Sequence, residues 1–505
     1  MSDQVTTLRT ALVVTSRELS EHARTPLVWI LAIAAVLLTV LATEMGVQRM
    51  AMASQRHSQL EEERAAEIDR HLTLTGARVE PGLRVLRAPE PLLMLVEGQE
   101  LGRPQYWDFG PAGVHSGPAL AFDTAYAPDT PSLDLEMVMR IVIGLLAVLL
   151  AVESVSGERA SGTLLVLLGQ PVSPGAVSAG KIAGAAGTLA LAIAGCALGA
   201  IVTIVSRSPR APDADIYWSL LAICASGLLY AAICFSIGML ISTLLTSYRL
   251  ALTITFVVWS LSALVLPQAG LAIARLAAPA PPHSVVDADR ERLAQRLTEA
   301  TQRRMGDEYA AALGGPTAWP AKQSDVAASR DAQTKVETMW SAHIESLRRE
   351  LETRRVAVDR AEDRQRRLVR ALLLANPAGA FTAAAGDLTA VGGRNAVRWR
   401  SAVLAYEAVL NEKLFDNRPL VIALVPYVSS RAPGEERRLV VEFRHGPQTL
   451  SSDMPRFQPP DQGFGHRFRD AAAALLVLVA YATVSAVLCV LAFRTRQFDW
   501  SRVEQ

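Results

Sequence analysis

Cysteine is scarce in this sequence, and its placement excludes a disulfide framework. The chain of 505 residues contains four cysteines, and each lies inside a long apolar segment. The polar parts of the chain therefore have no cysteine pair to cross-link them. Inside a membrane, such side chains behave more as small apolar residues than as metal ligands. The four positions are Cys196, Cys224, Cys234 and Cys489.

Signals for catalysis, metal binding and nucleotide binding are also missing. No G-x-S-x-G or zinc-protease motif occurs, and the eight histidines show neither H-x-x-x-H spacing nor pairing with cysteine. Gly175–Lys181 fits the first seven positions of a phosphate-binding loop, but Ile182 stands where a serine or threonine would hold magnesium. Met45, Met50 and Met52 could bind soft copper, although packing at the interface is the simpler interpretation. We expect no catalytic residue, metal site or cofactor in this chain.

An excess of one charge sign is absent too, and apolar residues are abundant instead. The formal net charge is +1 and no basic tract interleaved with aromatic residues appears, so nucleic acid is not an expected partner. Half of the residues are hydrophobic and the mean hydropathy is positive, which is unusual for a soluble chain. Six apolar segments are long enough to cross about 30 Å of hydrocarbon at about 1.5 Å per residue, which predicts a predominantly α-helical, six-span polytopic membrane protein. The segments are Pro26–Thr43, Leu133–Val152, Ile182–Val205, Tyr217–Leu240, Leu250–Ile273 and Ala471–Phe493.

A cleaved signal peptide is the alternative interpretation of the first apolar segment. It is disfavoured because the polar stretch before the segment is long and no clean small-x-small cleavage site follows the apolar run. Thr6–His22 has an amphipathic helical pattern instead, so we expect residues 1–25 to form an interfacial helix on membrane lipids. The apolar positions that can share one face of this helix are Leu8, Ala11, Leu12 and Leu19.

Basic residues in the short connections predict the orientation of the spans. Long domains cross a membrane regardless of their charge, so only the short loops are informative. An even number of spans places the arginines near both chain ends on one side, together with Arg159, Lys181 and Arg249 of the short loops. The loop 206–215, which carries two arginines, is a mild exception. Both termini, including the tail 494–505, are therefore expected in the cytoplasm.

This topology sends two large polar blocks, 44–132 and 274–470, to the outer side. The first contains a charged helical pattern and an extended run closed by a turn. The second contains two long helical patterns, of which the latter has a coiled-coil-like seam, and then two short strands. Neither block has a generous core alone, so we expect them to associate into one α+β extracytoplasmic domain with long helices. In chain order the patterns are Gln48–His71, Ala88–Gln99, Val285–Leu313, Ala327–Leu374, Pro419–Pro426 and Arg438–Arg444.

Charged residues are nearly absent from the predicted spans, apart from Asp134, Glu136 and Arg140 toward the outer end of the second one. Carriers driven by protons or sodium usually need carboxylates, histidines or broken helices within the membrane. If the protein moves a substrate, its energy is therefore expected from another subunit. Arg140 either snorkels toward the outer interface or contacts a substrate, and both interpretations stay open. Thr253 and Ser260 add polar positions to that candidate substrate path.

Small residues in the third span permit the close approach of another helix. Gly180 and Gly184 form one pair spaced by four residues, and Gly195 and Gly199 form a second pair. Packing within the chain and a seam between two copies of the chain explain these pairs equally well.

The polar segment between the second and third spans is the most informative part of the sequence. It is too polar to cross a membrane, although its neighbours on both sides are predicted to do so. Gly157 and Gly162 allow a turn before a short apolar helix, Leu164–Leu168, that can lie on a groove of a soluble partner. Glu153 and Glu158 either meet basic groups of that partner or cap the amino end of the helix, where negative charge is favourable.

The same segment carries a family resemblance. Its pattern Glu-x-x-x-Gly-Glu-x-x-x-Gly-Thr-Leu, followed by an apolar run, Pro-Val-Ser-Pro and a Gly-Lys that leads into a span, resembles the second-to-third-span loop of ABC-2-type transporter permeases. The resemblance implies a coupling helix that sits on a cytoplasmic ATP-hydrolysing subunit, which itself binds the ATP. The residues of the implied coupling site are Glu153, Gly157, Glu158, Gly162, Thr163, Leu164, Leu168 and Lys181.

Two motifs of the outer blocks extend the resemblance to one subfamily of these permeases. Ala88–Gln99, and Asn376–Ala390 followed by Tyr406, are similar to a bacterial subfamily with large extracytoplasmic insertions after spans one and five. The resemblance implies a permease subunit of an exporter in the bacterial inner membrane, without an ATPase motif of its own, that pairs with a second copy or a related permease. Two alternatives stay open: an ATP-driven mechanotransmitter that acts through its outer domain, and a membrane-anchored scaffold that binds an envelope partner.

Overall fold

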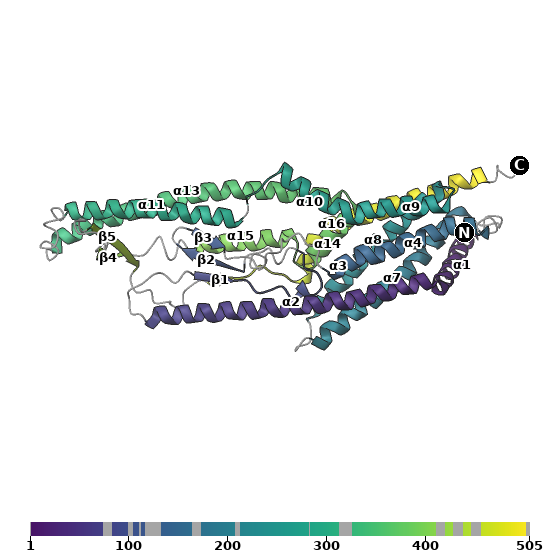
Figure 1. Cartoon of the computed structure of the whole chain (residues 1–505), viewed down its shortest axis with the longest axis horizontal. Coiled ribbons are helices and arrows are strands. Elements are labelled where there is room, and N and C mark those ends of the chain that lie inside the picture. The colour runs from purple at the N-terminus through teal and green to yellow at the C-terminus, as the bar shows by residue number, and fades with distance from the viewer. Residues whose placement is uncertain are drawn as a thin grey trace.

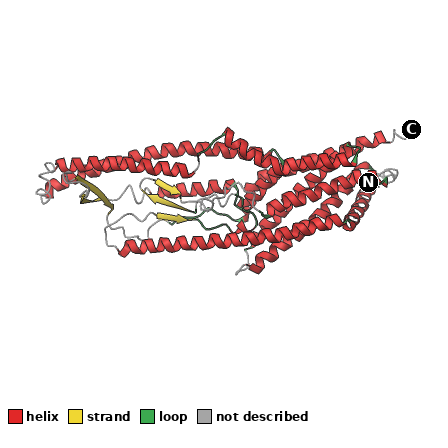
Figure 2. Cartoon of the chain, viewed as in Figure 1, coloured by secondary structure: helices red, strands yellow, loops and turns green. Residues whose placement is uncertain are grey.

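The protein is elongated, with a bundle of membrane-type helices at one end and a domain of long helices and short strands at the other (Figure 1). Both chain termini lie at the bundle end, and the strands all lie in the opposite half (Figure 2). The computed structural model describes residues 2–73, 83–98, 105–110, 113–116, 133–163, 173–207, 213–281, 283–312, 326–410, 420–427, 438–445 and 456–500.

Six helical segments of the described chain are long and apolar enough to cross a membrane, as the sequence predicts. The second contains two stretches of π-helix and the fifth contains one, whereas the others are single α-helices. The fold class predicted from hydropathy, a predominantly α-helical polytopic membrane protein, is confirmed. The six segments are Pro26–Arg64, Leu135–Ala160, Pro174–Arg207, Ala214–Leu244, Tyr248–Ala277 and Phe464–Thr495.

The elements that build these segments have the following bounds. They are α2 Pro26–Thr73, α3 Leu135–Val138, η4 Met139–Ile143, α4 Gly144–Val152, η5 Glu153–Gly157, α5 Glu158–Ala160, α7 Pro174–Arg207, α8 Ala214–Leu244, α9 Tyr248–Ser260, η6 Leu261–Val265, α10 Leu266–Ala277 and α16 Phe464–Trp500. Three of the η elements, η4, η5 and η6, are π-helices, whose widened turns are frequent at functional positions.

The chain begins with two helices separated by a single residue. The first, α1, spans Ser2–Arg24 and is the amphipathic helix predicted before the first span. After Thr25, a proline at position 26 starts α2. The first N–H groups of a helix have no intrahelical acceptor, so the N–H that proline lacks costs no hydrogen bond there. The separate charged helix predicted over Gln48–His71 is instead the uninterrupted continuation of α2 beyond its apolar part.

Two antiparallel helices extend the molecule away from the bundle. They are α11, His283–Ala312, and α13, Val326–Leu374, and both agree closely with the predicted helical patterns. Of the predicted seam, Leu347 and Leu351 are buried, and Met305 of α11 is buried as well. The apolar seam therefore holds the hairpin together, while the charged face stays exposed.

The strands form two small antiparallel sheets. One has the order β1 Leu83–Leu86, β2 Tyr106–Gly110, β3 Gly113–Ser116, and the other pairs β4 Leu420–Tyr427 with β5 Arg438–His445. The sequence predicted β4 and β5 but not the first sheet. It was also wrong about the run after residue 88, because Pro91–Met94 forms a buried 3-10 helix, η1, in place of an extended strand.

The two polar blocks pack on one another through an aromatic cluster. Helix α15, Gly393–Leu410, belongs to the second block and covers the first sheet. Trp399 of α15 stacks on Trp107 of β2, with ring centroids 5.6 Å apart, and Tyr406 meets Phe109 edge to face at 5.2 Å. Residues of both blocks therefore form one shared core, in agreement with the small number of apolar residues in either block alone.

One part of the second block enters the helix bundle, which the sequence-based boundaries did not anticipate. After α13 the chain turns at Ala375 and Asn376 into α14, Pro377–Leu388, whose buried residues belong to the core of the bundle. Phe381 of α14 stacks on Tyr230 of α8 at 5.4 Å. A 12-residue helix rich in alanine and glycine is too short to be recognised as a span. Hydropathy therefore does not predict that α14 enters the bundle.

Candidate functional site

The polar segment after the second span lies at the end of the bundle that holds both termini (Figure 1). Its first part is described: η5 and α5 continue the second span, and the chain then turns at Gly162. Gly162 has φ +77°, a left-handed conformation that favours glycine, so the predicted turn is present. The predicted apolar helix Leu164–Leu168 lies outside the described residues, as does Pro171, the first residue of the Pro-Val-Ser-Pro stretch.

Two serines hold the π-helix η5 against the end of α8. The hydroxyls of Ser156 and Ser242 lie 2.6 Å apart, and the backbone N–H of Ser156 donates to the Ser242 hydroxyl at 3.0 Å. Arg159 donates to the carbonyl of Leu245 just beyond α8. The segment is therefore anchored to the fourth span before it reaches the surface.

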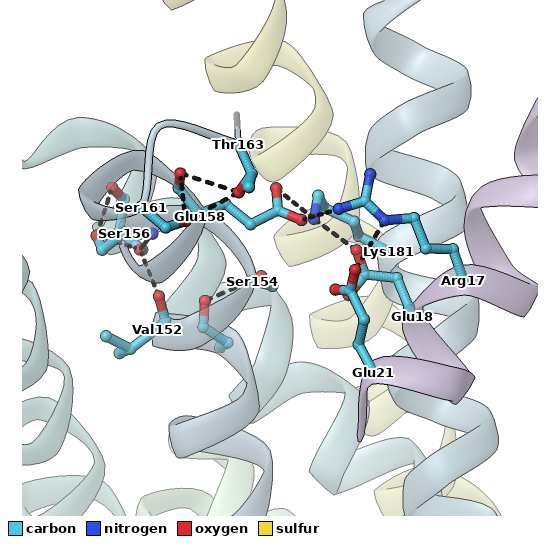
Figure 3. Close-up of polar contacts among 12 residues, drawn as sticks. Arg17, Glu18, Glu21, Val152, Ser154, Ser156, Glu158, Ser161, Thr163 and Lys181 are labelled. Carbon is cyan, nitrogen blue, oxygen red and sulfur yellow. Dashed lines mark hydrogen bonds and ion pairs between the residues drawn. The ribbon is translucent and has the colours of Figure 1, made fainter. Parts of the chain in front are cut away.

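A buried ion cluster ties this segment to α1 and α7 (Figure 3). Lys181 of α7 is fully buried, and its Nζ lies 2.6 Å from Glu18 Oε1 and 2.9 Å from Glu158 Oε2. Arg17 lies 3.8 Å from Glu158 and forms a surface ion pair with Glu21. One buried ammonium therefore joins carboxylates from two different elements, and removing one partner of such a cluster leaves an uncompensated buried charge.

His22 extends the cluster along α1. Its Nδ1 lies 2.9 Å from the Thr188 hydroxyl and its Nε2 lies 3.7 Å from Glu18. Burial and the nearby Lys181 ammonium lower the pKa of His22, although Glu21 partly opposes them. The ring is therefore neutral at pH 7, where it can bridge α1 and α7 without adding a charge.

The lowered pKa of His22 predicts a loss of stability in acid. A histidine that binds its proton more tightly in the unfolded chain destabilises the fold as the pH falls below its ordinary value of about 6.5. His22→Gln keeps a hydrogen-bonding side chain but cannot be protonated. The difference in melting temperature, wild type minus variant, should thus be largest at about pH 8 and shrink toward about pH 5.5. Parallel melting profiles of the two proteins would contradict this assignment.

The glycines of the third span lie against helices of the same chain. A Cβ at Gly180 would lie 2.7 Å from Val14 Cβ, and one at Gly184 would lie 2.6 Å from Glu18 Cβ. Farther along α7, Cβ atoms at Gly195 and Gly199 would each lie 3.0 Å from a valine of α2. The glycine positions therefore let α1 and α2 approach α7 closely, and α1 brings Glu18 within reach of Lys181.

The structure changes the expected roles of the charged residues in the segment. The Glu158 side chain is buried within this chain, and its carboxylate pairs with Lys181. Among the described residues, α5 has no side-chain cap at its amino end, and the helix that Glu158 was expected to cap lies outside them. Lys181 is fully enclosed within this chain. Glu153 is exposed and accepts a hydrogen bond from Tyr248 at 2.8 Å, and Thr163 is exposed as well.

Sequence reasoning missed the contributions of α1 and α8. Glu18 and His22 lie four residues apart on one face of α1, a spacing that could have indicated a polar stripe facing the protein. The apolar positions emphasised instead are partly exposed, since Leu12 has 64 % of its surface accessible. Nothing in the sequence around Ser242 marks its contact with η5.

The candidate substrate path is occupied by internal contacts around Arg140. Its Nε lies 2.8 Å from Glu136, and its guanidinium donates to the carbonyl of Ala263 in η6. Glu136 also accepts a hydrogen bond from Thr382 of α14 at 2.5 Å. Arg140 is thus buried and neutralised within the bundle, and it joins the second span, the fifth span and α14.

The other two path positions take part in local structure. Thr253 is exposed and donates to the carbonyl of Arg249 one turn earlier in its helix. Ser260 is half-buried and precedes the π-helix η6. Neither position adds to the Arg140 network through the contacts that the described residues make.

A comparison with known protein families identifies the family of this chain. A family model described as "ABC-2 family transporter protein" matches residues 12–498, which is nearly the whole chain. The chain belongs to the ABC-2 transporter family. This protein is therefore a permease subunit of an ABC transporter, and permeases of this family work with a cytoplasmic ATPase. No curated protein matches the chain.

Proposed function

We propose that this ABC-2 permease is an exporter subunit and that its separate ATPase docks on the end of the second span and on α1. The observation that carries the proposal is the Lys181 cluster, which joins the exposed end of the polar segment to two other helices through buried charges. A force applied to that segment would reach α1 and α7 together, because separating them would leave charges unpaired in a dry environment.

The proposed cycle follows from this rigid connection. Closure of the ATPase would push on the segment around Thr163 and tilt the second and third spans against those of a second permease, either another copy or a related chain. The substrate path between the two permeases would then alternate its access. In this proposal both termini lie in the cytoplasm of a bacterium, and the strand-containing domain lies outside the inner membrane.

A mechanotransmitter is the second candidate, and the length of α2 favours it. This helix has 48 residues and runs without a break from the bundle to the far domain. Cytoplasmic ATP hydrolysis could therefore move the outer domain without passing a substrate. Reconstituted vesicles distinguish the two functions, because only a transporter accumulates a substrate when ATP is supplied.

The docking site is tested by copurification of the permease with its ATP-hydrolysing subunit. Ser161 and Thr163 are exposed, so Ser161→Arg/Thr163→Arg should place two large cations on the docking surface and reduce ATPase recovery at least tenfold. The matched control is Thr334→Arg/Ser341→Arg, which changes exposed residues of α13 in the far domain. Equal recovery of the ATPase with all three proteins would contradict the proposal.

A further inference from the structure

The carboxyl end of α13 lies at the depth of the middle of the bundle. The hydroxyl of Tyr481 donates to the carbonyl of Leu374 at 3.3 Å, and Tyr481 is near the centre of the last apolar segment, Ala471–Phe493. Asn376 exchanges hydrogen bonds of 2.6 and 2.7 Å with Ser262 in the fifth span. Helix α13 therefore descends into one leaflet before the chain turns into α14.

This depth places three arginines of α13 at the membrane surface. At about 1.5 Å per residue, Arg367, Arg364 and Arg360 lie about 10, 15 and 21 Å from Leu374 along the helix. Half of a hydrocarbon core is about 15 Å thick, and the headgroups extend to about 20–22 Å from the midplane. The three arginines span the boundary between hydrocarbon and headgroups.

These arginines share the exposed face of the helix. All three are exposed, and their spacing of four and three residues aligns them in one stripe. Arg366 and Arg370 lie on the protein side instead, where they pair with Glu362 and Asp387. The helix thus separates its basic residues into a paired inner set and an outward stripe.

The outward stripe has no acid bound to it among the described contacts. Arg364 donates to a backbone carbonyl of its own helix, and the nearby Asp363 lies 3.9 Å from Arg366. Farther from the membrane, by contrast, Arg349 and Arg354 each pair with a glutamate four residues earlier. Arginines without acidic partners therefore occur on this face at the level of the headgroups.

An apolar surface lies on α10, the helix that packs against α13. Helix α10 approaches α13 where a Cβ at Gly270 would lie 3.4 Å from Leu372 Cβ. Farther along α10, Ile273 and Leu276 have 51 % and 85 % of their surfaces accessible. A ligand with an anionic group and apolar chains would satisfy the stripe and this surface together.

We propose that Arg360, Arg364 and Arg367 bind the headgroup phosphates of anionic phospholipids in the leaflet that α13 enters. Guanidinium groups bind phosphate oxygens through paired hydrogen bonds, and such bonds are strengthened near hydrocarbon. The acyl chains of the bound lipid lie against Ile273 and Leu276. The geometry holds on whichever side of the membrane this leaflet lies, so it does not depend on the proposed direction of transport.

The proposal is tested by titrating a fluorescent phosphatidylglycerol analogue onto the full-length permease in detergent. An arginine near a charged membrane surface contributes about a fivefold gain in affinity, so Arg364→Gln/Arg367→Gln should weaken binding about thirtyfold. The matched control Arg349→Gln/Arg354→Gln removes the same charge from the same helix but away from the membrane, and should bind as the wild type does. A phosphatidylcholine analogue should bind weakly to all three proteins.

Three results would overturn the proposal. The first is unchanged affinity of the Arg364/Arg367 variant, or an equal loss in the control. The second is competition by inorganic phosphate at the concentration at which the lipid itself binds, which would indicate a small-anion site. The third is a variant that loses a dimer on gel filtration while its lipid affinity is unchanged, because the stripe would then bind a second copy of the chain.

Discussion

Replacing Lys181 with methionine is expected to lower the free energy of unfolding by about 3–5 kcal/mol, because Glu18 and Glu158 would then face each other in a buried site without a cation. ATP-driven transport should fall with it, since α1 would no longer be fixed to the end of the second span. Unfolding in denaturant, followed by tryptophan fluorescence in detergent, measures the first effect, and vesicle transport assays measure the second.

A triple variant distinguishes the effect of the buried charges on stability from the role of the Lys181 cluster in coupling α1 to the second span. Lys181→Met combined with Glu18→Gln and Glu158→Gln leaves no buried charge, so most of the lost stability should return, whereas coupled transport should not. Lys335→Met serves as the control, because Lys335 forms an exposed pair with Glu308 and its loss should not change stability measurably. Full transport by the triple variant would show that the cluster stabilises the fold but does not transmit movement.

Gly180→Val should displace α1 from the bundle. Its Cβ would lie 2.7 Å from Val14 Cβ and 2.8 Å from the carbonyl oxygen of Ala11, and that carbonyl is backbone that cannot move without shifting the helix. Overpacking of this kind costs about 1–3 kcal/mol or more. Hydrogen exchange of the α1 amides should accelerate at least tenfold, and copurification of the ATPase should decrease.

Gly175 supplies the matched control for that substitution. It lies in the first turn of the same helix, but no heavy atom of the described residues outside its own helix turn lies within 4 Å of the position its Cβ would take. Gly175→Val should therefore leave exchange of the α1 amides unchanged. Equal acceleration in both variants would mean that valine perturbs α7 itself, and that the contact with α1 is not the cause.

The parts of the fold that hydropathy controls were predictable from the sequence. A span must bury about 20 apolar residues in hydrocarbon, so its existence follows from composition alone. The long helices of the far domain were predictable for a similar reason, because Leu347 and Leu351 recur at helical spacing on a charged background. The β4–β5 hairpin followed from two short runs rich in β-branched residues.

The connections between distant segments were not predictable in the same way. Lys181 pairs with Glu18, which lies 163 positions away, and no local pattern links the two. Glu158 matched a family position, but only the three-dimensional arrangement shows that it faces inward. Helix α14 was missed because its alanines and glycines give a weak apolar signal, although Phe381 places it in the core.

The uninterrupted course of α2 has a mechanical consequence. A helix of 48 residues is about 72 Å long, so pivoting it by about 10° at Thr25 displaces its far end by about 12 Å. No proline or glycine kink in its outer half is available to absorb that rotation, and α1 sits directly at the pivot. A small rotation where the ATPase would dock is thus converted into a displacement of about 12 Å at the far end of α2.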